Sequence, residues 1–270
     1  MAWLLWLILV PLGVCLGVFV LGTLLAFLTP CPSPKLHDRF LYFWARRYLR
    51  IIHRWRVEGA KHVPMTGGVL LVANHTAGLD PILVSTCCPR TVRWIMALDM
   101  RLPQLEWFWK WQQIIFVGRE GKAAPDGSSP GDRGAAGVRA ALEELSRGGV
   151  VGIYPEGGIE RPPEMVMPFQ AGVGLMIRKA KVPVVPVWIS GTAPVDPAWA
   201  SLWHRSKSRV VFGEPIDYTD KKMSAAEIAA DLRQWMLKTS GWPMNDTSPA
   251  MREKAEALAR SADQPGTSVA

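Results

Sequence analysis

The first 28 residues carry no charged side chain, and no other feature constrains the chain as strongly. A helix of this length reaches about 40 Å, whereas the hydrocarbon core of a bilayer is about 30 Å thick. A cleaved signal peptide would need an early basic residue, a shorter apolar core and a small-residue cleavage site. We therefore expect residues 1–30 to be embedded in a membrane, either as one spanning helix or as a hairpin in one leaflet. Pro11 and Gly13 would permit the bend of a hairpin.

Residues 31–56 combine basic and aromatic side chains. Most of the net charge of +8 lies here, because seven basic residues face a single acid, Asp38. The apolar residues recur at near-helical spacing, which predicts an amphipathic helix in the interface, apolar side toward lipid and arginines toward phosphates. A helix packed on the protein core is the alternative. The basic residues are Lys35, Arg39, Arg46, Arg47, Arg50, Arg54 and Arg56.

The position of this charge also decides between classes of partner. A basic segment directly after an apolar one suits anionic lipid headgroups, and we expect no nucleic-acid partner. By the positive-inside rule the main domain lies on the cytoplasmic side of the cell membrane. The cysteines show no zinc spacing and no Cys-x-x-Cys pair, so we expect reduced thiols, as is usual in the cytoplasm. They are Cys15, Cys31, Cys87 and Cys88.

Residues 57–240 alternate short apolar runs with helix signals, which predicts an α/β domain with a mostly parallel central sheet flanked by helices. The expected strands are 67–74, 91–98, 112–119, 148–158, 181–191 and 208–216. The expected helices are 81–87, 102–111, 134–146, 173–180 and 224–238. Residues 120–134, rich in Gly, Pro, Asp and Ser, predict a mobile loop. Residues 241–270 predict a polar, partly disordered tail.

The stretch ANHTAGLDP, residues 73–81, contains a candidate catalytic pair. Asp80 followed by Pro81 is typical of a helix start, with Asp as the N-cap, so His75 falls on the loop before that helix. Across such a loop a carboxylate can accept a hydrogen bond from one imidazole nitrogen and leave the other basic. This is the His–Asp half of a serine-protease site, with the nucleophile supplied by a substrate. The alternative is that Asp80 only caps and His75 only packs.

Four blocks in order extend this interpretation. NHTAGLD (74–80) resembles the His-x4-Asp signature of the glycerolipid acyltransferases, the family of 1-acyl-glycerol-3-phosphate acyltransferases. FVGR (116–119) resembles the family's Phe-x-x-Arg block, and YPEGG (154–158) resembles Phe-Pro-Glu-Gly-Thr-Arg. VPVVPV (182–187) is similar to its fourth block, an apolar strand with prolines. Together the blocks identify residues 57–216 as a member of this family.

The resemblance implies a reaction. His75 would act as general base on an acceptor hydroxyl, which attacks the thioester carbonyl of acyl-CoA or acyl-carrier protein, while Asp80 orients the imidazole. Lysophosphatidic acid is the leading acceptor, and phosphatidic acid the product. The resemblance implies no metal and no cofactor beyond the acyl donor.

The resemblance also implies acceptor-binding residues. Arg119 would pair with the phosphate, since a guanidinium fork suits two oxygens. Glu156 would hold a glycerol hydroxyl beside the flexible Gly157 and Gly158, and residues 182–187 are either core strand or a floor for the acyl chain. Phe116 belongs to the same substrate-binding set.

Two positions depart from the family pattern. Gly158 and Ile159 stand where the family usually has Thr and Arg, and Gln170 stands where it often has Lys. Arg161 is the nearest cation that could restore the charge. A different lyso-lipid, such as a lyso-amino-acid lipid, or an alcohol therefore remains open as acceptor. A non-catalytic, membrane-anchored lipid-binding protein is the third hypothesis, and the intact pair of His75 and Asp80 counts against it.

Overall fold

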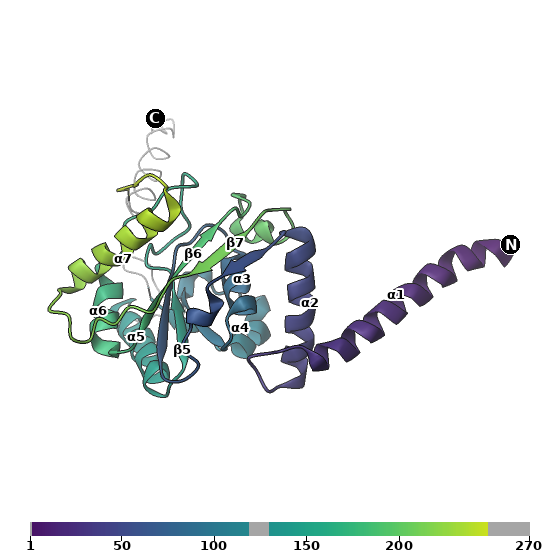
Figure 1. Ribbon diagram of the computed structural model, residues 1–270, viewed down its shortest axis with the longest axis horizontal. Coiled ribbons are helices and arrows are strands. Elements are labelled where there is room, and N and C mark those ends of the chain that lie inside the picture. The colour runs from purple at the N-terminus through teal and green to yellow at the C-terminus, as the bar shows by residue number, and fades with distance from the viewer. Residues whose placement is uncertain (1, 119–129, 248–270) are drawn as a thin grey trace, which may run out of the picture.

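A single sheet organises the part of the chain that the computed structural model describes, residues 2–118 and 130–247 (Figure 1). Its seven strands follow the order β1-β7-β6-β2-β5-β3-β4. The five strands from β6 to β4 are parallel, whereas β7 is antiparallel to β6 and β1 is parallel to β7. The predicted mostly parallel α/β fold is thus confirmed. The strands are β1 (Arg56–Glu58), β2 (Val69–Ala73), β3 (Val92–Ala97), β4 (Ile115–Val117), β5 (Val150–Ile153), β6 (Val184–Ser190) and β7 (Arg209–Phe212).

Helices cover both faces of this sheet. One face packs against α2 and α3, and the other packs against α5, α6 and α7. The helices are α1 (Ala2–Leu28), α2 (Leu36–Ile52), α3 (Asp80–Cys87), α4 (Glu106–Gln112), α5 (Pro130–Ser146), α6 (Ala171–Ala180) and α7 (Ala225–Ser240). Short 3-10 turns include η3 (Pro103–Leu105) before α4 and η4 (Ala198–Leu202) before β7.

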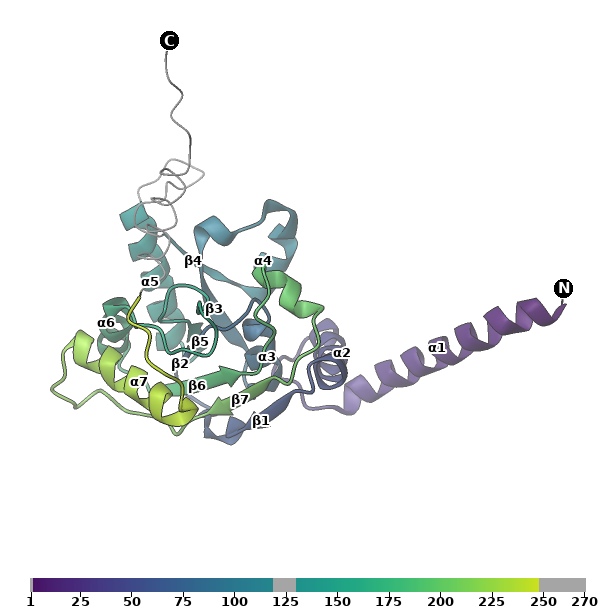
Figure 2. The ribbon, with the colours of Figure 1, turned by 90° about the horizontal axis from the view of Figure 1, so that it is seen from above.

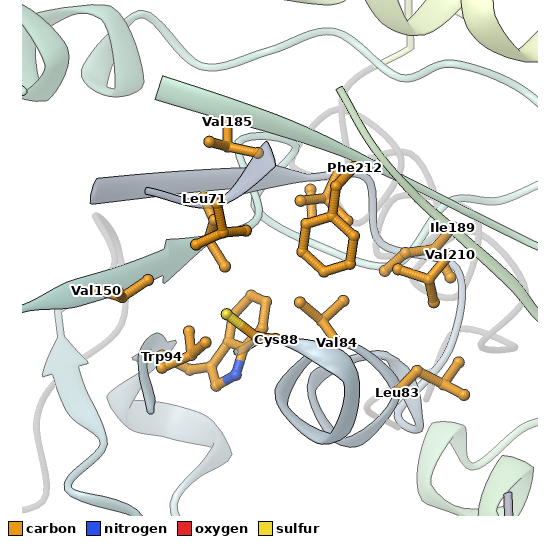
Figure 3. Close-up of a cluster of buried hydrophobic side chains, with 14 of the residues drawn as sticks. Leu71, Leu83, Val84, Cys88, Trp94, Val150, Val185, Ile189, Val210 and Phe212 are labelled. Atoms are coloured by element: carbon orange, nitrogen blue, oxygen red, sulfur yellow. The ribbon is translucent and has the colours of Figure 1, made fainter. Parts of the chain in front are cut away.

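The core follows from the alternation of side chains along the strands. In β2, Leu70 and Val72 join the cluster under α5, α6 and α7, whereas Leu71 lies in the cluster on the opposite face. Figure 3 shows that opposite cluster, where the apolar side of α3, including Leu83 and Val84, meets the central strands. Because β2 is buried on both sides, the loop that follows it starts from a rigid position.

The helix α1 runs unbroken through Pro11 and Gly13, so it does not fold into a hairpin at these residues. It projects away from the α/β domain in both views (Figures 1 and 2). Within it, Leu9–Leu28 is long and apolar enough to cross a membrane. This is the one helix among the described residues that meets that condition.

Part of α2 packs against α1 and the domain. Phe43 and Leu49 are buried, and Trp44 stacks on Phe19 of α1, with ring centroids 5.8 Å apart. Arg46 donates hydrogen bonds to the carbonyl oxygens of Thr86 and Pro30 instead of pointing to open solvent. These contacts agree with the alternative of a packed helix, while Leu41 and Ile51 remain exposed, so contact of α2 with lipid stays a prediction.

The element boundaries show which sequence signals were insufficient. The sequence did not indicate β1, because a three-residue edge strand has too few positions to show alternation. Helix α5 begins at Pro130, inside the segment expected to be a loop. The rest of that expected loop, residues 120–129, lies outside the described residues, as do residues 248–270 of the expected tail.

Candidate active site

The loop of residues 74–79 leaves the carboxyl end of β2, between the ends of β5 and β6. Ligand sites of open α/β sheets lie at this edge. Asn74 fixes the start of the loop, because its side-chain amide both donates to the Ile189 carbonyl and accepts from the Ile189 N–H, at 2.9 and 2.7 Å. The loop is therefore tied to β6 before it reaches His75.

His75 and Asp80 meet across this loop. The distance from His75 Nδ1 to Asp80 Oδ2 is 2.8 Å, and Asp80 is fully buried, whereas the His75 side chain is 19% exposed. With Nδ1–H donating to the carboxylate, the lone pair of the imidazole lies on Nε2. No hydrogen bond joins Nε2 to the part of the chain that the structure describes.

Asp80 does not act as the predicted N-cap. Helix α3 begins at Asp80 itself, and no side-chain cap bond is formed there. The chain turns at residues 77–79, so the carboxylate folds back over the preceding loop. Its Oδ2 accepts from the N–H groups of Thr76 and Ala77, at 2.6 and 2.8 Å, and its Oδ1 accepts from the Thr76 hydroxyl at 2.9 Å. Asp80 thus holds both the loop and the imidazole.

The turn of residues 154–160 supports His75 from behind. The Glu156 carboxylate accepts a hydrogen bond from the His75 N–H at 3.3 Å, and the Glu160 N–H donates to the His75 carbonyl at 2.8 Å. Glu156 is fully buried, so it presents no surface to a glycerol hydroxyl. In this structure Glu156 holds the loop that carries His75, and its contact with an acceptor hydroxyl stays a prediction.

Three acids therefore crowd together beneath the loop. Burial, and next the neighbouring Glu160, raise the pKa of Glu156 well above its usual range. Burial raises the pKa of Glu160 to about 8, and the Asp80 charge adds to this effect. Glu156 Oε1 and Glu160 Oε2 have no hydrogen-bond partner among the described residues. Both glutamates are thus largely protonated at neutral pH.

Two aromatic rings extend the imidazole into a stack. Tyr154 lies on His75 with ring centroids 4.1 Å apart and an interplanar angle of 16°. Trp94 lies on Tyr154 at 4.8 Å and 7°, and the Trp94 indole N–H donates to Ser85 Oγ at 2.8 Å. The stack limits rotation of the imidazole about its χ angles.

The segment 198–202, which contains η4, closes the other side of the loop. The Gly78 N–H donates to the Ala198 carbonyl at 3.2 Å, and the Leu79 N–H donates to Ser201 Oγ at 3.1 Å. A Cβ on Gly78 would lie 2.7 Å from the Ala198 oxygen, so this close approach requires glycine.

Two further predicted residues, Phe116 and Arg161, lie in the described part of the chain. Phe116 lies in β4 at the edge of the sheet, three strands from β2, which is roughly 14 Å at about 4.8 Å per strand. Arg161 forms an ion pair with Asp196 at 3.0 Å. Arg119 lies outside the described residues.

The fourth block, residues 182–187, and the turn at Gly157 both pack tightly against other parts of the domain. Val184, Val185 and Val187 are fully buried, so this part of residues 182–187 is core strand. Gly157 adopts φ +74°, and a Cβ there would lie 1.9 Å from the Gln170 side-chain nitrogen. The Gln170 side chain thus packs directly on the turn at Gly157. Gly158 is the next residue of that turn.

Sequence reasoning missed several residues that hold the base. Asn74 and Thr76 flank His75, and polar residues on both sides of a candidate base were a usable signal. Glu160 follows the turn closely and could have been noticed as an acid in an apolar context. Trp94 gave no signal, because only the pairing of β3 with β5 brings it to Tyr154.

Among the described residues, no side-chain nucleophile forms a hydrogen bond with Nε2 of His75. The hydroxyl of the next residue, Thr76, is engaged with both Asp80 and Thr192, at 2.9 and 2.7 Å. A proton acceptor at the mouth of a loop, oriented by a buried carboxylate, is suited to activating a hydroxyl that a substrate brings.

Comparison with known proteins agrees with this geometry. The family model described as Acyltransferase matches residues 54–190, which include the His75 loop and the turn of residues 154–160. Among solved structures, the 1-acyl-sn-glycerophosphate (LPA) acyltransferase PlsC from Thermotoga maritima has a similar fold, with a TM-score of 0.55. The two sequences are 20% identical, over 90% of this chain and 88% of that one.

Proposed function

Because the chain belongs to the glycerolipid acyltransferase family, we propose that it is a membrane-bound O-acyltransferase that acylates lysophosphatidic acid to phosphatidic acid. Acyl-CoA or acyl-carrier protein would supply the acyl group as a thioester. The observation that carries the proposal is the bond from His75 Nδ1 to Asp80 Oδ2, which leaves Nε2 as the basic nitrogen.

The reaction uses this nitrogen twice. Nε2 of His75 takes the proton of the acceptor hydroxyl as the oxygen attacks the thioester carbonyl. The tetrahedral intermediate then collapses, the C–S bond breaks, and the departing thiolate takes the proton from the imidazolium. The products are an ester and a free thiol, and the imidazole is neutral again.

Asp80 contributes through charge and geometry. Its buried carboxylate, fixed by the Thr76 and Ala77 N–H groups, stabilises the imidazolium that forms during attack. The backbone of His75 is held on both sides by the turn of residues 154–160. The base is therefore in position before substrate binds, which lowers the entropic cost of reaching the transition state.

Two sequence positions support a different class of acceptor. Gly158 and Gln170 replace two residues that the family pattern makes polar or cationic, and Arg161 would have to leave Asp196 to reach a phosphate. The same chemistry on a different lyso-lipid or an alcohol is the alternative that these positions favour.

Membrane attachment would come from α1. Its stretch Leu9–Leu28 is long enough to span, and the basic residues that follow favour a cytoplasmic α/β domain by the positive-inside rule. The acceptor and product are both lipids, so an anchored enzyme would work without extracting either from the bilayer.

The test compares membranes from cells that overexpress the wild type, His75→Ala or His62→Ala. His62 bonds the Phe212 carbonyl and Glu214, away from the His75 loop, and is a control for loss of a histidine. Radiolabelled acyl-CoA is supplied with lysophosphatidic acid, other lysophospholipids, a lyso-amino-acid lipid or a long-chain alcohol. We expect phosphatidic acid from the wild type and His62→Ala only.

Two other results of this assay would change the functional assignment. A His75-dependent product with another acceptor alone would replace lysophosphatidic acid by that acceptor. If no acceptor yields a His75-dependent product with either acyl-CoA or acyl-carrier protein, the enzymatic assignment is wrong and the lipid-binding hypothesis takes its place.

A further inference from the structure

A cavity with a volume of about 460 Å³ lies between α6 and the segment 218–224, which leads into α7. Four basic side chains line it, two from the carboxyl-terminal end of α6 and two from that segment. They are Arg178, Lys181, Lys221 and Lys222. No lining residue is acidic, and a concave wall with one sign of charge focuses the electrostatic potential.

These four cations have no acidic partner in the described part of the chain. None of them forms an ion pair or a side-chain hydrogen bond with a described residue. By contrast, Arg93 pairs with Glu144 and Arg209 pairs with Glu58, both at 2.7 Å. The positive charge of the cavity is therefore not neutralised by contact with a described carboxylate.

The acids that are nearest in sequence do not line the cavity either. Three of them accept hydrogen bonds from the Thr219 N–H, the Ser224 N–H and the Tyr218 hydroxyl, at 2.8, 2.6 and 2.6 Å. An anion in the cavity would thus meet basic groups without a carboxylate in the lining. The four acids nearest in sequence are Asp217, Asp220, Glu227 and Asp231.

Phosphate groups are the anions that suit this wall. An ammonium group binds a phosphate as a point charge, and a guanidinium group donates to two of its oxygens at once. One phosphate monoester carries a charge of about −1.5 to −2 at pH 7, so four cations match at least two such groups. The Ser224 hydroxyl lines the cavity, accepts from the Glu227 N–H and keeps its own hydrogen for a phosphate oxygen.

The position of the cavity favours a soluble ligand. Helices α6 and α7 lie at the end of the domain opposite α1 in both views (Figures 1 and 2). If α1 crosses a bilayer, the cavity faces water on the far side of the domain. Lys181 precedes β6 whereas His75 follows β2, and the register of these strands separates the two residues by roughly 25 Å at about 3.3 Å per residue. The ligand is therefore not a group that reacts at His75.

We propose that this cavity binds a soluble anion that carries two or more phosphate groups, such as a nucleoside diphosphate. Arg178 and Lys181 would hold it from α6, and Lys221 and Lys222 from the segment 218–224. The proposal is independent of the acyl-transfer assignment, because it concerns a separate site and its test needs no activity.

Helix α6 connects this cavity to the catalytic turn. The N–H of its N-cap residue, Gln170, donates to the Pro155 carbonyl at 2.8 Å, and the Gln170 side chain packs on Gly157. The other end of the helix carries Arg178 and Lys181. A ligand in the cavity would therefore bind an element that also contacts the turn of residues 154–160.

Calorimetric titration with inorganic pyrophosphate measures this site directly. The full-length protein in an uncharged detergent is compared with Arg178→Gln/Lys222→Gln and with the control Lys179→Gln/Lys238→Gln. Both variants lose two positive charges, but Lys179 and Lys238 are exposed residues of α6 and α7 that do not line the cavity. Glutamine has nearly the helix propensity of lysine and arginine, so both variants should fold.

We expect pyrophosphate to bind the wild type and the control with similar affinity, and Arg178→Gln/Lys222→Gln at least about tenfold more weakly, because charge-assisted contacts are strong. Inorganic phosphate should bind the wild type more weakly than pyrophosphate. Equal affinities of the two variants, or no binding to the wild type, would overturn the proposal. Displacement of pyrophosphate by phosphatidic acid in mixed micelles would also overturn it, because the ligand would then be a lipid headgroup.

Amide hydrogen exchange localises the anion without a variant. With saturating pyrophosphate we expect slower exchange in residues 177–182 and 218–226. Slower exchange only in other segments, such as the loop of residues 74–79, would place the anion elsewhere and contradict the proposed site. If Arg178→Gln/Lys222→Gln is unstable, Lys221→Gln/Lys222→Gln repeats the titration with both substitutions in the segment before α7.

Discussion

Tyr154 lies flat against the imidazole of His75, with ring centroids 4.1 Å apart and an interplanar angle of 16°. The ring belongs to the same turn whose backbone and side chain bond the His75 peptide groups. The turn that family resemblance assigned to the substrate therefore positions the base from two directions. This relationship determines how the site should respond to mutation.

Replacing Tyr154 by Leu should lower kcat while KM for the acceptor changes little. The loss of stacking would let the imidazole rotate, and misplacement of a catalytic group costs about tenfold to a hundredfold in rate. Tyr154→Phe is the matched control, since it keeps the ring and removes only a buried hydroxyl that has no partner among the described residues. Steady-state kinetics in which Leu and Phe behave alike would contradict the positioning role.

Replacing Asp80 by Asn should lower kcat about a thousandfold or more, because an amide neither stabilises the imidazolium nor reliably fixes its tautomer. Stability should fall by about 1–3 kcal/mol, since an amide cannot accept all the hydrogen bonds that Asp80 receives. Thr192→Val, which removes only the bond to Thr76, should lose far less activity. Near-wild-type turnover by Asp80→Asn would exclude the proposed pair.

Glu160 should make the protein less stable as the pH rises. Its pKa is about 8 in the folded protein and near 4.5 in an unfolded chain, so folding favours the protonated form. The stability from this group is fully present below about pH 4.5 and is lost as the pH rises through about 8.

Glu160→Gln keeps a neutral side chain at every pH. Near pH 9 its free energy of unfolding should therefore exceed that of the wild type by about 2–4 kcal/mol, and its melting temperature should be higher. Near pH 4.5 the two proteins should have the same melting temperature. The exposed pair of Glu143 and Arg147 offers a control, and Glu143→Gln should leave the pH dependence unchanged. Parallel melting curves for Glu160→Gln and wild type across this range would show that Glu160 is not held protonated.

Gly78 should tolerate no side chain. A Cβ there would lie 2.7 Å from the Ala198 carbonyl oxygen, so Gly78→Ala must separate the segment 198–202 from the catalytic loop. We expect a loss of about 1–3 kcal/mol, as for overpacking, together with lower kcat. Gly172→Ala is the control, because nothing lies within 4 Å of its Cβ and alanine favours the helix α6. Equal melting temperatures for the two variants would refute this close approach.

Elements with strong periodicity were predictable, and features that depend on long-range contacts were not. The apolar run of β2 and the Asp-Pro start of α3 placed His75 on a loop at the correct edge of the sheet. The His75–Asp80 pair followed from that placement. Local sequence signals therefore placed His75 and Asp80 within reach of each other, while their interpretation as a catalytic pair depended on the family resemblance.

The supporting residues required the three-dimensional structure. Glu156 reads as a polar turn residue, yet the fold buries it completely beneath His75, 81 positions away in sequence. Trp94 reaches Tyr154 only because β3 pairs with β5. The apolar side of α2 looked suited to lipid, but α1 and the domain cover much of it. The sequence could not predict this, because helical periodicity shows that a helix has an apolar side and not which surface that side contacts.

The most direct test of the central claim is acyl transfer by purified protein in phospholipid vesicles, with radiolabelled acyl-CoA and lysophosphatidic acid as substrates. We predict that wild type and His62→Ala form phosphatidic acid at similar rates. His75→Ala, folded and inserted equally well, should be slower by about a hundredfold to ten-thousandfold, the range for loss of a general base. Equal rates for His75→Ala and wild type would contradict the assignment of His75 as the catalytic base.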